Sequence, residues 1–238
     1  MGLFEDAVEV WNQEMAQQAT RPWNRRLASG DLGLAHYKGF LFETYHNAGL
    51  NPQLQAYATL FIDGRPRDAF KKFFQHAISE LGHDLLAIED LEALGVARTE
   101  VLSSEPLPET RAFFANTVYS IQSRGPASYL SYLFHLEYTP TQNGPAIMQM
   151  LKAKGVPEGA LTFLHEHSTV DINHLKLMRT YLSEVVRTED ERKLFLGCLR
   201  ECIVLHTRML EAAFENGEKM FGADASVHAV GLNLQKSS

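Results

Sequence analysis

The sequence has few cysteines, no basic run and no long apolar segment, and each shortage excludes a class of protein. Its two cysteines, Cys198 and Cys202, cannot form a disulfide framework. The 22 Lys and Arg residues are outnumbered by 29 Asp and Glu residues, and the net charge of −7 argues against binding to nucleic acid or to an anionic membrane. No window approaches the roughly 18 consecutive apolar residues of a transmembrane helix.

The N-terminal segment lacks targeting signals as well. MGLFEDAVEVWNQEM carries acids where a secretory signal peptide has a basic region, and no apolar stretch follows it. Asp6 stands where a myristoylation signal has Ser or Thr. We therefore expect a cytoplasmic protein that contacts neither a membrane nor nucleic acid.

Signals for β-strands are also missing, because short alternating runs and an Asn-Gly turn between apolar segments do not occur. No linker divides the chain, so we expect one all-α bundle of about seven to eight helices over residues 1–222 and a frayed tail over residues 223–238. Residues 99–108 are expected to form a loop. Helical periodicity punctuated by Gly and Pro predicts helical stretches over 3–28, 31–47, 53–62, 66–94, 109–123, 126–138, 144–154, 157–184 and 189–221, the last opened by a capping box at Thr188.

What the sequence does have is histidine, with ten in all and six of them between residues 76 and 174. Three segments combine histidines with acids: a Glu-x-x-His, a single Glu among apolar and aromatic residues, and a His-x3-Asp-x2-His. The last spacing places its three side chains on one helix face. The candidate metal ligands are Glu80, His83, Glu137, His167, Asp171 and His174.

Imidazole and carboxylate ligands without thiolate suit cations such as Fe(II) and Mn(II). Helical bundles build dimetal sites from such residues on several facing helices, with the ions roughly 3.5–4 Å apart. One Glu-x-x-His alone is more often a solvated helix face. Here the face of the His-Asp-His trio continues in Phe163, Leu164 and Met178. Since buried charge is costly without a partner, we predict a site for two metal ions per chain, with Fe(II) and Mn(II) as the candidate metals.

A substrate pocket is expected beside the ligand faces. His76 shares the face of Glu80 and is interpreted as an outer or additional ligand. Glu43-x-x-His46 is a possible second ligand pair, but we favour a role in lining the pocket. An apolar substrate with one polar end suits this mixture, with Arg111, Arg179 or Arg208 as a carboxylate anchor. The predicted pocket residues are Tyr45, His46, Phe73, His76, Phe134, Tyr138 and Met178.

Simpler interpretations are expected for the remaining polar candidates. His165 is predicted to face solvent and His135 to pack in the interior. The acids that follow His83 are predicted to be solvated, namely Asp84, Glu89 and Asp90. The residues Cys198, Cys202 and His206 recur at helical spacing and are interpreted as a core stripe rather than a metal site.

The order Glu80-x-x-His83, Glu137, His167-x3-Asp171-x2-His174 resembles the ligand set of the heme-oxygenase-like diiron oxidases. It is most similar to that of their fatty-acid decarboxylase that forms 1-undecene. The segments RPWNRRLASGDL, YKGFLFETYHN and NPQLQAYA are similar to the opening of the wider thiaminase II and pyrroloquinoline-quinone synthase superfamily. The resemblance covers about residues 20–215.

This resemblance implies a heme-oxygenase-like bundle that uses O2 and two Fe(II) ions through a peroxo-diferric intermediate. The expected substrate is a small amino acid or a fatty-acid-like molecule, oxidised by C–C cleavage or N-oxygenation, and we expect a homodimer. By the same resemblance Glu80, His83 and His167 bind one iron. Glu137, Asp171 and His174 bind the other, and Glu80 or Glu137 bridges the two.

Two other readings remain open. A ferritin-like bundle would use Glu43, Glu80, His83, Glu137, Asp171 and His174, but it leaves His167 without a role. A metal-free binding module of the thiaminase II-like superfamily would treat the same residues as satisfied polar groups of the core. Thiaminase II activity itself is not expected, because it uses a mid-chain cysteine and the cysteines here are Cys198 and Cys202.

Overall fold

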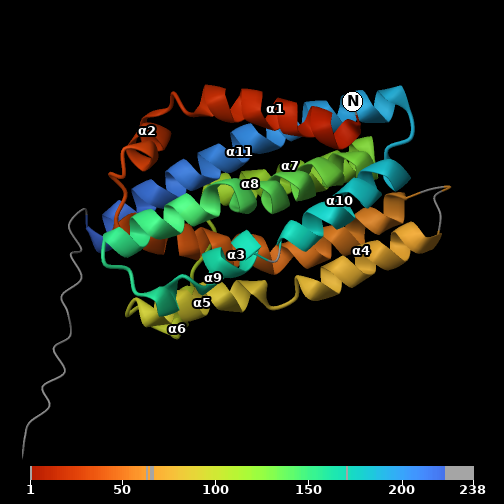
Figure 1. The fold of residues 1–238 in the computed structure, drawn as a ribbon. Helices are drawn as coiled ribbons and strands as arrows, with labels where there is room; N and C mark the ends of the chain where they lie inside the picture. Colours follow the sequence, from red (N-terminus) through yellow and green to blue (C-terminus); the bar gives the residue numbers. More distant parts are fainter. Residues whose placement is uncertain (1, 63, 65–66, 170, 223–238) are drawn as a thin grey trace, which may run out of the picture.

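The computed structural model describes residues 2–62, 64, 67–169 and 171–222, and the side chains of residues 169 and 171–173 also lie outside the description. All regular elements of the described part are helices, which confirms the predicted all-α class (Figure 1). They are α1 (Leu3–Gln18), α2 (Pro22–Ala28), α3 (Leu34–Ala58), η1 (Thr59–Phe61), α4 (Arg67–Ser79), α5 (His83–Ala93), α6 (Arg98–Leu102), α7 (Pro108–Arg124), α8 (Pro126–Ala153), η2 (Glu158–Ala160), α9 (Thr162–Thr169), α10 (Asp171–Val185) and α11 (Glu189–Phe221).

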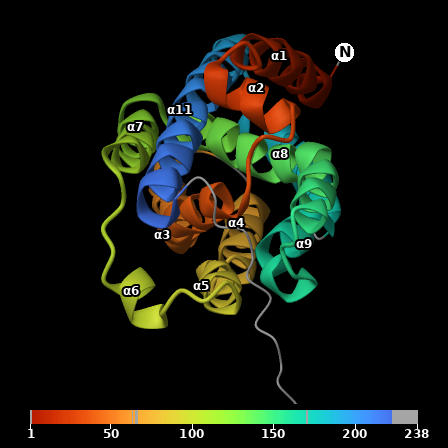
Figure 2. The same cartoon turned by 90° about the vertical axis from the view of Figure 1, so that its left-hand side faces the viewer.

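The long helix α11 packs against α1, α3, α7 and α8, and the end-on view in Figure 2 shows these helices grouped around it. Two pairs of shorter helices complete the bundle. Helices α4 and α5 follow one another along α3, and α9 and α10 follow one another along α8 (Figure 1). Because α5 contacts α9 and α4 contacts α10, the junctions within the two pairs lie opposite each other.

The junction between α4 and α5 corrects the prediction of one helix over residues 66–94. Helix α4 ends at Ser79, and α5 begins at His83 after Gly82, whose φ of 93° lies in the left-handed region. Glycine adopts this conformation without the steric cost that a Cβ imposes. The turn places Glu80 between two helices instead of within one.

Prolines inside helices account for two further differences. Helix α3 continues through Pro52, where a break was predicted, and α8 continues through Pro140 and Pro145. An interior proline costs a helix about 3 kcal/mol, but both helices are packed against several neighbours. Tertiary packing therefore overrides these local stop signals. The short helix α6 also occupies part of the predicted loop at residues 99–108.

Helix α11 matches its predicted bounds. The hydroxyl of Thr188 accepts a hydrogen bond from the backbone N–H of Glu191, and the Glu191 carboxylate accepts one from the N–H of Thr188. This reciprocal cap fixes the start of the helix locally, which is why the sequence alone predicts it.

A close helix crossing holds α3 against α11. A Cβ atom on Gly217 would lie 2.3 Å from the carbonyl oxygen of Ala35, and one on Gly39 would lie 2.1 Å from that of Ala213. Side chains at either glycine would force the helices apart. The crossing therefore fixes how closely α3 lies against α11. Helix α3 in turn packs against α4 and α5.

No helix among the described residues combines the length and the apolar character needed to cross a membrane.

Candidate metal centre

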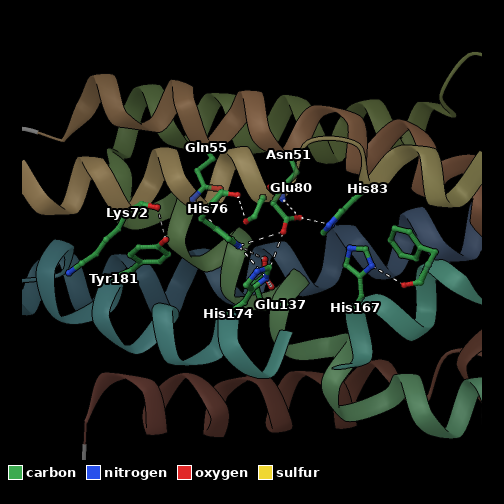
Figure 3. A network of polar contacts seen from close by, with 12 residues as sticks. Asn51, Gln55, Lys72, His76, Glu80, His83, Glu137, His167, His174 and Tyr181 are labelled. Carbon is green, nitrogen blue, oxygen red and sulfur yellow. Dashed lines mark hydrogen bonds and ion pairs between the residues drawn. The ribbon is translucent and has the colours of Figure 1, made fainter. Parts of the chain in front are cut away.

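Two groups of candidate ligands meet at Glu80 (Figure 3). The four-residue group consists of His76, Glu80, Glu137 and His174, and all four are buried. The three-residue group consists of Glu80, His83 and His167. Within each group, one donor atom from every residue lies within 4.8 Å of the others. The structure thus brings together five of the six predicted ligands and adds His76, while the side chain of Asp171 lies outside the described residues.

The helix junctions explain how residues so far apart in sequence converge. His76 lies in the last turn of α4, Glu80 lies in the turn after it, and His83 is the first residue of α5. Across the bundle, His167 lies near the end of α9 and His174 in the first turns of α10. Each junction therefore has one of these histidines before it and one after it. The buried Glu137 reaches the same place from a further helix, α8.

The four-residue group has the dimensions of a metal site. The Nε2 atom of His76 lies 3.6 Å from Oε1 of Glu80 and 3.3 Å from Oε1 of Glu137. The Nδ1 atom of His174 lies 2.9 Å from Oε2 of Glu137 and 3.7 Å from Oε1 of Glu80. The two histidines approach each other to 3.3 Å between these nitrogens. Four donors placed tetrahedrally about one ion at 2.0–2.1 Å are separated by roughly 3.4 Å, so these spacings fit.

The three-residue group is built around the other carboxylate oxygen of Glu80, Oε2. Its Oε2 atom lies 3.3 Å from Nδ1 of His83, and the rings of His83 and His167 meet edge to face with centroids 4.8 Å apart. Nδ1 of His167 donates a 2.8 Å hydrogen bond to the carbonyl oxygen of Phe163, whose ring stacks on the imidazole. That bond fixes the tautomer and leaves Nε2 of His167 available to a metal ion.

Unpaired atoms at the centre also fit a bound cation. Oε1 of Glu80 and Nδ1 of His83 are buried and make no hydrogen bond within the described part of the chain. A buried charged group without a partner is costly. A metal ion bound beside Glu80 would satisfy both atoms, so the residues present fit a bound metal cation.

The protonation states of Glu137 and His167 favour metal binding. Burial raises the pKa of the Glu137 carboxyl, but hydrogen bonds from His174 and His76 outweigh it and hold that pKa well below its usual value. Burial lowers the pKa of His167, which keeps its imidazole neutral. The Glu80 carboxylate, 3.3 Å away, raises the pKa of His83, so a metal ion bound there has to displace the proton that Glu80 favours on this imidazole. Metal binding requires ionised carboxylates and neutral imidazoles.

Two amides of α3 support the ligands, and sequence reasoning missed both. The Asn51 side chain donates to Oε2 of Glu80 at 3.4 Å and accepts a 3.3 Å hydrogen bond from the hydroxyl of Tyr129. The amide of the fully buried Gln55 lies 3.0 Å from Nδ1 of His76. The only sequence signal is their spacing of four residues, which gives one face of a helix. The predicted break at Gly49–Pro52 obscured that signal.

The role of Asp90 was also not predicted from the sequence. It was predicted to be solvated, but it is completely buried and accepts hydrogen bonds from the backbone N–H groups of Thr162 and Phe163 at the start of α9. Glu43 has a similar role, because it accepts hydrogen bonds from the backbone N–H of Leu107 and the hydroxyl of Thr110 at the start of α7. These acids stabilise helix N-termini instead of contacting water or metal.

The predicted pocket residues separate into three places. Tyr45 and His46 line a cavity of about 490 Å³. His76 lies in the four-residue group instead. Phe73, Phe134 and Met178 are buried in the main hydrophobic core, and Tyr138 packs against it. The cavity is lined by Tyr45, His46, Gly49, Leu50, Asp84, Pro106, Arg111 and Phe114.

The predicted carboxylate anchors also separate. Arg111 lines this cavity, and its Nη1 atom donates to the carbonyl oxygen of Pro106 at 2.9 Å. Arg179 instead pairs with Glu5 and covers the ring of Phe4. Arg208 is not among the residues that line the cavity. Arg111 is therefore the anchor candidate that the cavity supports.

The remaining histidines and cysteines have the plain roles expected of them. Cys198 and Cys202 are buried and free. His135 is buried, and its Nε2 lies 2.8 Å from Nδ1 of His206. His165 is exposed on α9.

Comparisons with known proteins give a family for the sequence and a fold for the structure. The sequence matches the family described as iron-containing redox enzyme over residues 38–206. No match was found among curated proteins. The structure is similar to that of a domain of unknown function with a heme oxygenase-like fold from Shewanella denitrificans OS217, at 23% sequence identity and a TM-score of 0.83, over 96% of this chain and 99% of that one.

A second solved structure, a TenA homologue from P. horikoshii OT3, shows 12% sequence identity and a TM-score of 0.71, over 90% of this chain and 99% of that one. The TM-scores of these two matches show the shared fold and confirm the expected heme-oxygenase-like bundle. The family match covers most of the chain and spans both candidate ligand groups. The chain therefore belongs to the heme-oxygenase-like family of iron-containing redox enzymes.

Proposed function

We propose that the protein is a non-haem diiron oxidase or oxygenase that uses O2 to oxidise a small substrate. The observation that carries this proposal is the position of Glu80, whose Oε1 faces His76 and His174 while its Oε2 faces His83. A carboxylate shared by two groups of donors is the arrangement that bundles use to hold two ions. Membership of an iron-containing redox family supports iron as the metal.

Each ligand has a defined part in this proposal. Glu137 and His174 would hold one ion and His83 and His167 the other, with Glu80 shared between them. Bound iron supplies the electrons and the open coordination positions that O2 chemistry requires. The two buried carboxylates offset part of the positive charge. Asp171 stays a predicted ligand, because its sequence spacing places it on the same face as His167 and His174.

The ordered amides around the ligands keep them in place. Asn51 holds the orientation of Glu80, and the carbonyl oxygen of Phe163 holds that of His167. Tyr129 and Tyr181 are almost completely buried near the four-residue group, and they restrict water there. Partners that orient the ligands and a dry surrounding both tune the reactivity of a metal site.

The cavity beside α3 supports an amino acid as the substrate class over a fatty acid. Its lining includes the guanidinium of Arg111 and the carboxylate of Asp84, which suit a substrate carboxylate and a substrate ammonium group. Tyr45 and Phe114 supply aromatic surface for the side chain. Asp84 directly follows His83, and Leu50 directly precedes Asn51, so the cavity adjoins α5, which begins with the ligand His83, and the part of α3 that contacts Glu80.

The proposal is tested by loading the protein with Fe(II) under anaerobic conditions and measuring its metal content. We expect about two iron ions per chain and a new absorbance band when O2 is added. A screen of O2 consumption over amino acids and medium-chain fatty acids then identifies the substrate class. Less than about one metal ion per chain, together with no absorbance change, would refute the oxidase.

The same measurement tests a metal-free binding module. One observation favours that alternative: the ligands already contact each other, as in the hydrogen bond between His174 and Glu137. A module of this kind would bind amino acids at the cavity without iron. A ferritin-like bundle is less consistent with the structure, because Glu43 stabilises the start of α7 and His167 joins the candidate ligands. Full iron occupancy in His167→Ala would favour the ferritin-like alternative.

A further inference from the structure

We propose that His76 is a metal ligand in addition to the six that the sequence pattern predicts, and that Gln55 positions it. This inference rests on the proposed function, because it assigns a residue to the same metal centre. It also predicts that the four-residue group holds the more tightly bound of the two ions.

The surroundings of His76 leave it few other roles. It is buried at 3% exposure, one helical turn before Glu80. Its Nε2 atom lies 3.3 Å from Glu137, 3.6 Å from Glu80 and 3.3 Å from Nδ1 of His174. Carboxylate oxygens offer only lone pairs, so either a proton or a cation must lie between them and Nε2. A metal ion satisfies all four residues at once.

Gln55 supplies the second observation. Its amide nitrogen lies 3.0 Å from Nδ1 of His76, and its amide oxygen is buried with no hydrogen-bond partner among the described residues. The oxygen and nitrogen of an amide exchange places by a rotation of the group. With the oxygen toward His76, Gln55 accepts the Nδ1 proton, and the amide nitrogen takes the former place of the oxygen. The lone pair of His76 then lies on Nε2, directed at the two carboxylates.

This arrangement resembles the support that metal-binding histidines commonly have, in which the nitrogen that does not bind metal donates to an oxygen. Gln55 makes that contact from the neighbouring helix α3, and it is itself completely buried. The amide is therefore held in place by packing, and it fixes both the tautomer and the ring orientation of His76.

The two groups differ in the donors they offer an ion. The four-residue group has four buried donors, two of them carboxylates. The three-residue group has one carboxylate, and its two histidines are only partly buried. Among the described residues, the four-residue group therefore provides more charge and a less hydrated site. Both differences favour tighter binding of the first ion there.

Titration with Co(II) under anaerobic conditions tests the proposal, because the visible spectrum of Co(II) reports its ligands. We expect wild type to bind two Co(II) ions with unequal affinity. His76→Ala should weaken the tighter ion at least about tenfold and change its spectrum. Gln55→Leu should also weaken that ion by about tenfold, whereas Gln55→Glu, which can still accept the Nδ1 proton, should keep the wild-type spectrum. His165→Ala, at an exposed histidine, is the matched control.

The outcomes separate this inference from the proposed function. If wild type binds no Co(II), the metal centre itself is wrong. If wild type binds two ions and His76→Ala binds them with the same affinity and spectrum, His76 is not a ligand. Circular dichroism of the metal-free variants checks that they fold. Should His76→Ala fail to fold, equal Co(II) affinity in Gln55→Leu and Gln55→Glu overturns the proposal by itself.

Discussion

Asp90 and Thr162 are joined by two hydrogen bonds to a single oxygen atom: the backbone N–H of Thr162 lies 2.9 Å from Oδ1 of Asp90, and its hydroxyl lies 2.6 Å from the same atom. The other carboxylate oxygen accepts from the N–H of Phe163 and from the hydroxyl of Tyr37. Asp90 lies on the helix that begins with His83, and Thr162 begins the helix that carries His167. This one carboxylate therefore aligns both helices of the three-residue group.

Replacing Asp90 by Ala should lower the free energy of unfolding by about 3 kcal/mol, because two backbone N–H groups and the Thr162 hydroxyl lose their acceptor. Urea denaturation of the metal-free protein measures this change. Glu89→Ala is the control, since Glu89 is the exposed neighbour on the same helix and its loss should cost less than about 0.5 kcal/mol. Equal effects of the two substitutions would contradict the role given to Asp90.

Two glycines of α11 should respond in opposite ways to substitution by alanine. Gly217→Ala places a Cβ 2.3 Å from the carbonyl oxygen of Ala35 and should destabilise the protein by about 1–3 kcal/mol through overpacking. A Cβ on Gly197 meets nothing within 4 Å, so Gly197→Ala should stabilise it by about 0.5–1 kcal/mol through helix propensity. Thermal unfolding of both variants measures the sign. A stable Gly217→Ala protein would show that α3 and α11 can separate without cost.

Glu80 and Glu137 should differ in the number of metal ions that each controls. Glu80→Ala should abolish binding of both ions, because Glu80 belongs to both groups. Glu137→Ala should abolish one, because Glu137 belongs to the four-residue group alone. Elemental analysis after anaerobic loading gives the stoichiometry, with Glu89→Ala as the control. A Glu80→Ala protein that retains one ion would mean that the carboxylate is not shared.

The pair formed by the buried His135 and the partly buried His206 should make the protein less stable in mild acid. Burial lowers the pKa of His206 to about 4, below the value of about 6.5 in an unfolded chain. The unfolded state therefore binds more protons in this range, and the free energy of unfolding should fall as the pH drops from 6.5 toward 4. One such histidine accounts for about 2 kcal/mol between pH 7 and pH 5.

Urea denaturation at several pH values checks this effect on the metal-free protein. His206→Gln removes the titrating group while keeping a partner for His135. The free energy of unfolding of this variant should therefore fall less steeply than that of wild type as the pH is lowered. Parallel curves for the two proteins would show that His206 does not cause the loss.

The sequence predicts those parts of the fold that depend on local chemistry. The helical class and the bounds of α11 follow from periodicity and from the cap at Thr188. The left-handed turn at Gly82 and the uninterrupted passage of α3 through Pro52 do not, because packing between distant segments decides them. A glycine within a helical pattern is as compatible with a continuous helix as with a turn, and a proline is as compatible with a kink as with a break.

The candidate ligands follow the same division. Five of the six predicted ligands carry local spacings of acid and histidine that single them out, and Glu137 stands out as one acid among apolar and aromatic residues. Asp90 has no such signal, because its partners Thr162 and Phe163 lie more than seventy positions further along the chain. Burial of an acid by a remote helix N-terminus becomes visible only once the chain is folded.

The division of the Glu80 carboxylate between two groups has a thermodynamic consequence. Two ions held there would not be independent, since each changes the position and the charge of a donor that the other uses. Linkage requires the effect to be mutual: whatever factor the first ion applies to the affinity of the second, the second applies to the first. Metal content would then follow a single coupled isotherm, and a protein stripped of one ion would hold the other with a different affinity.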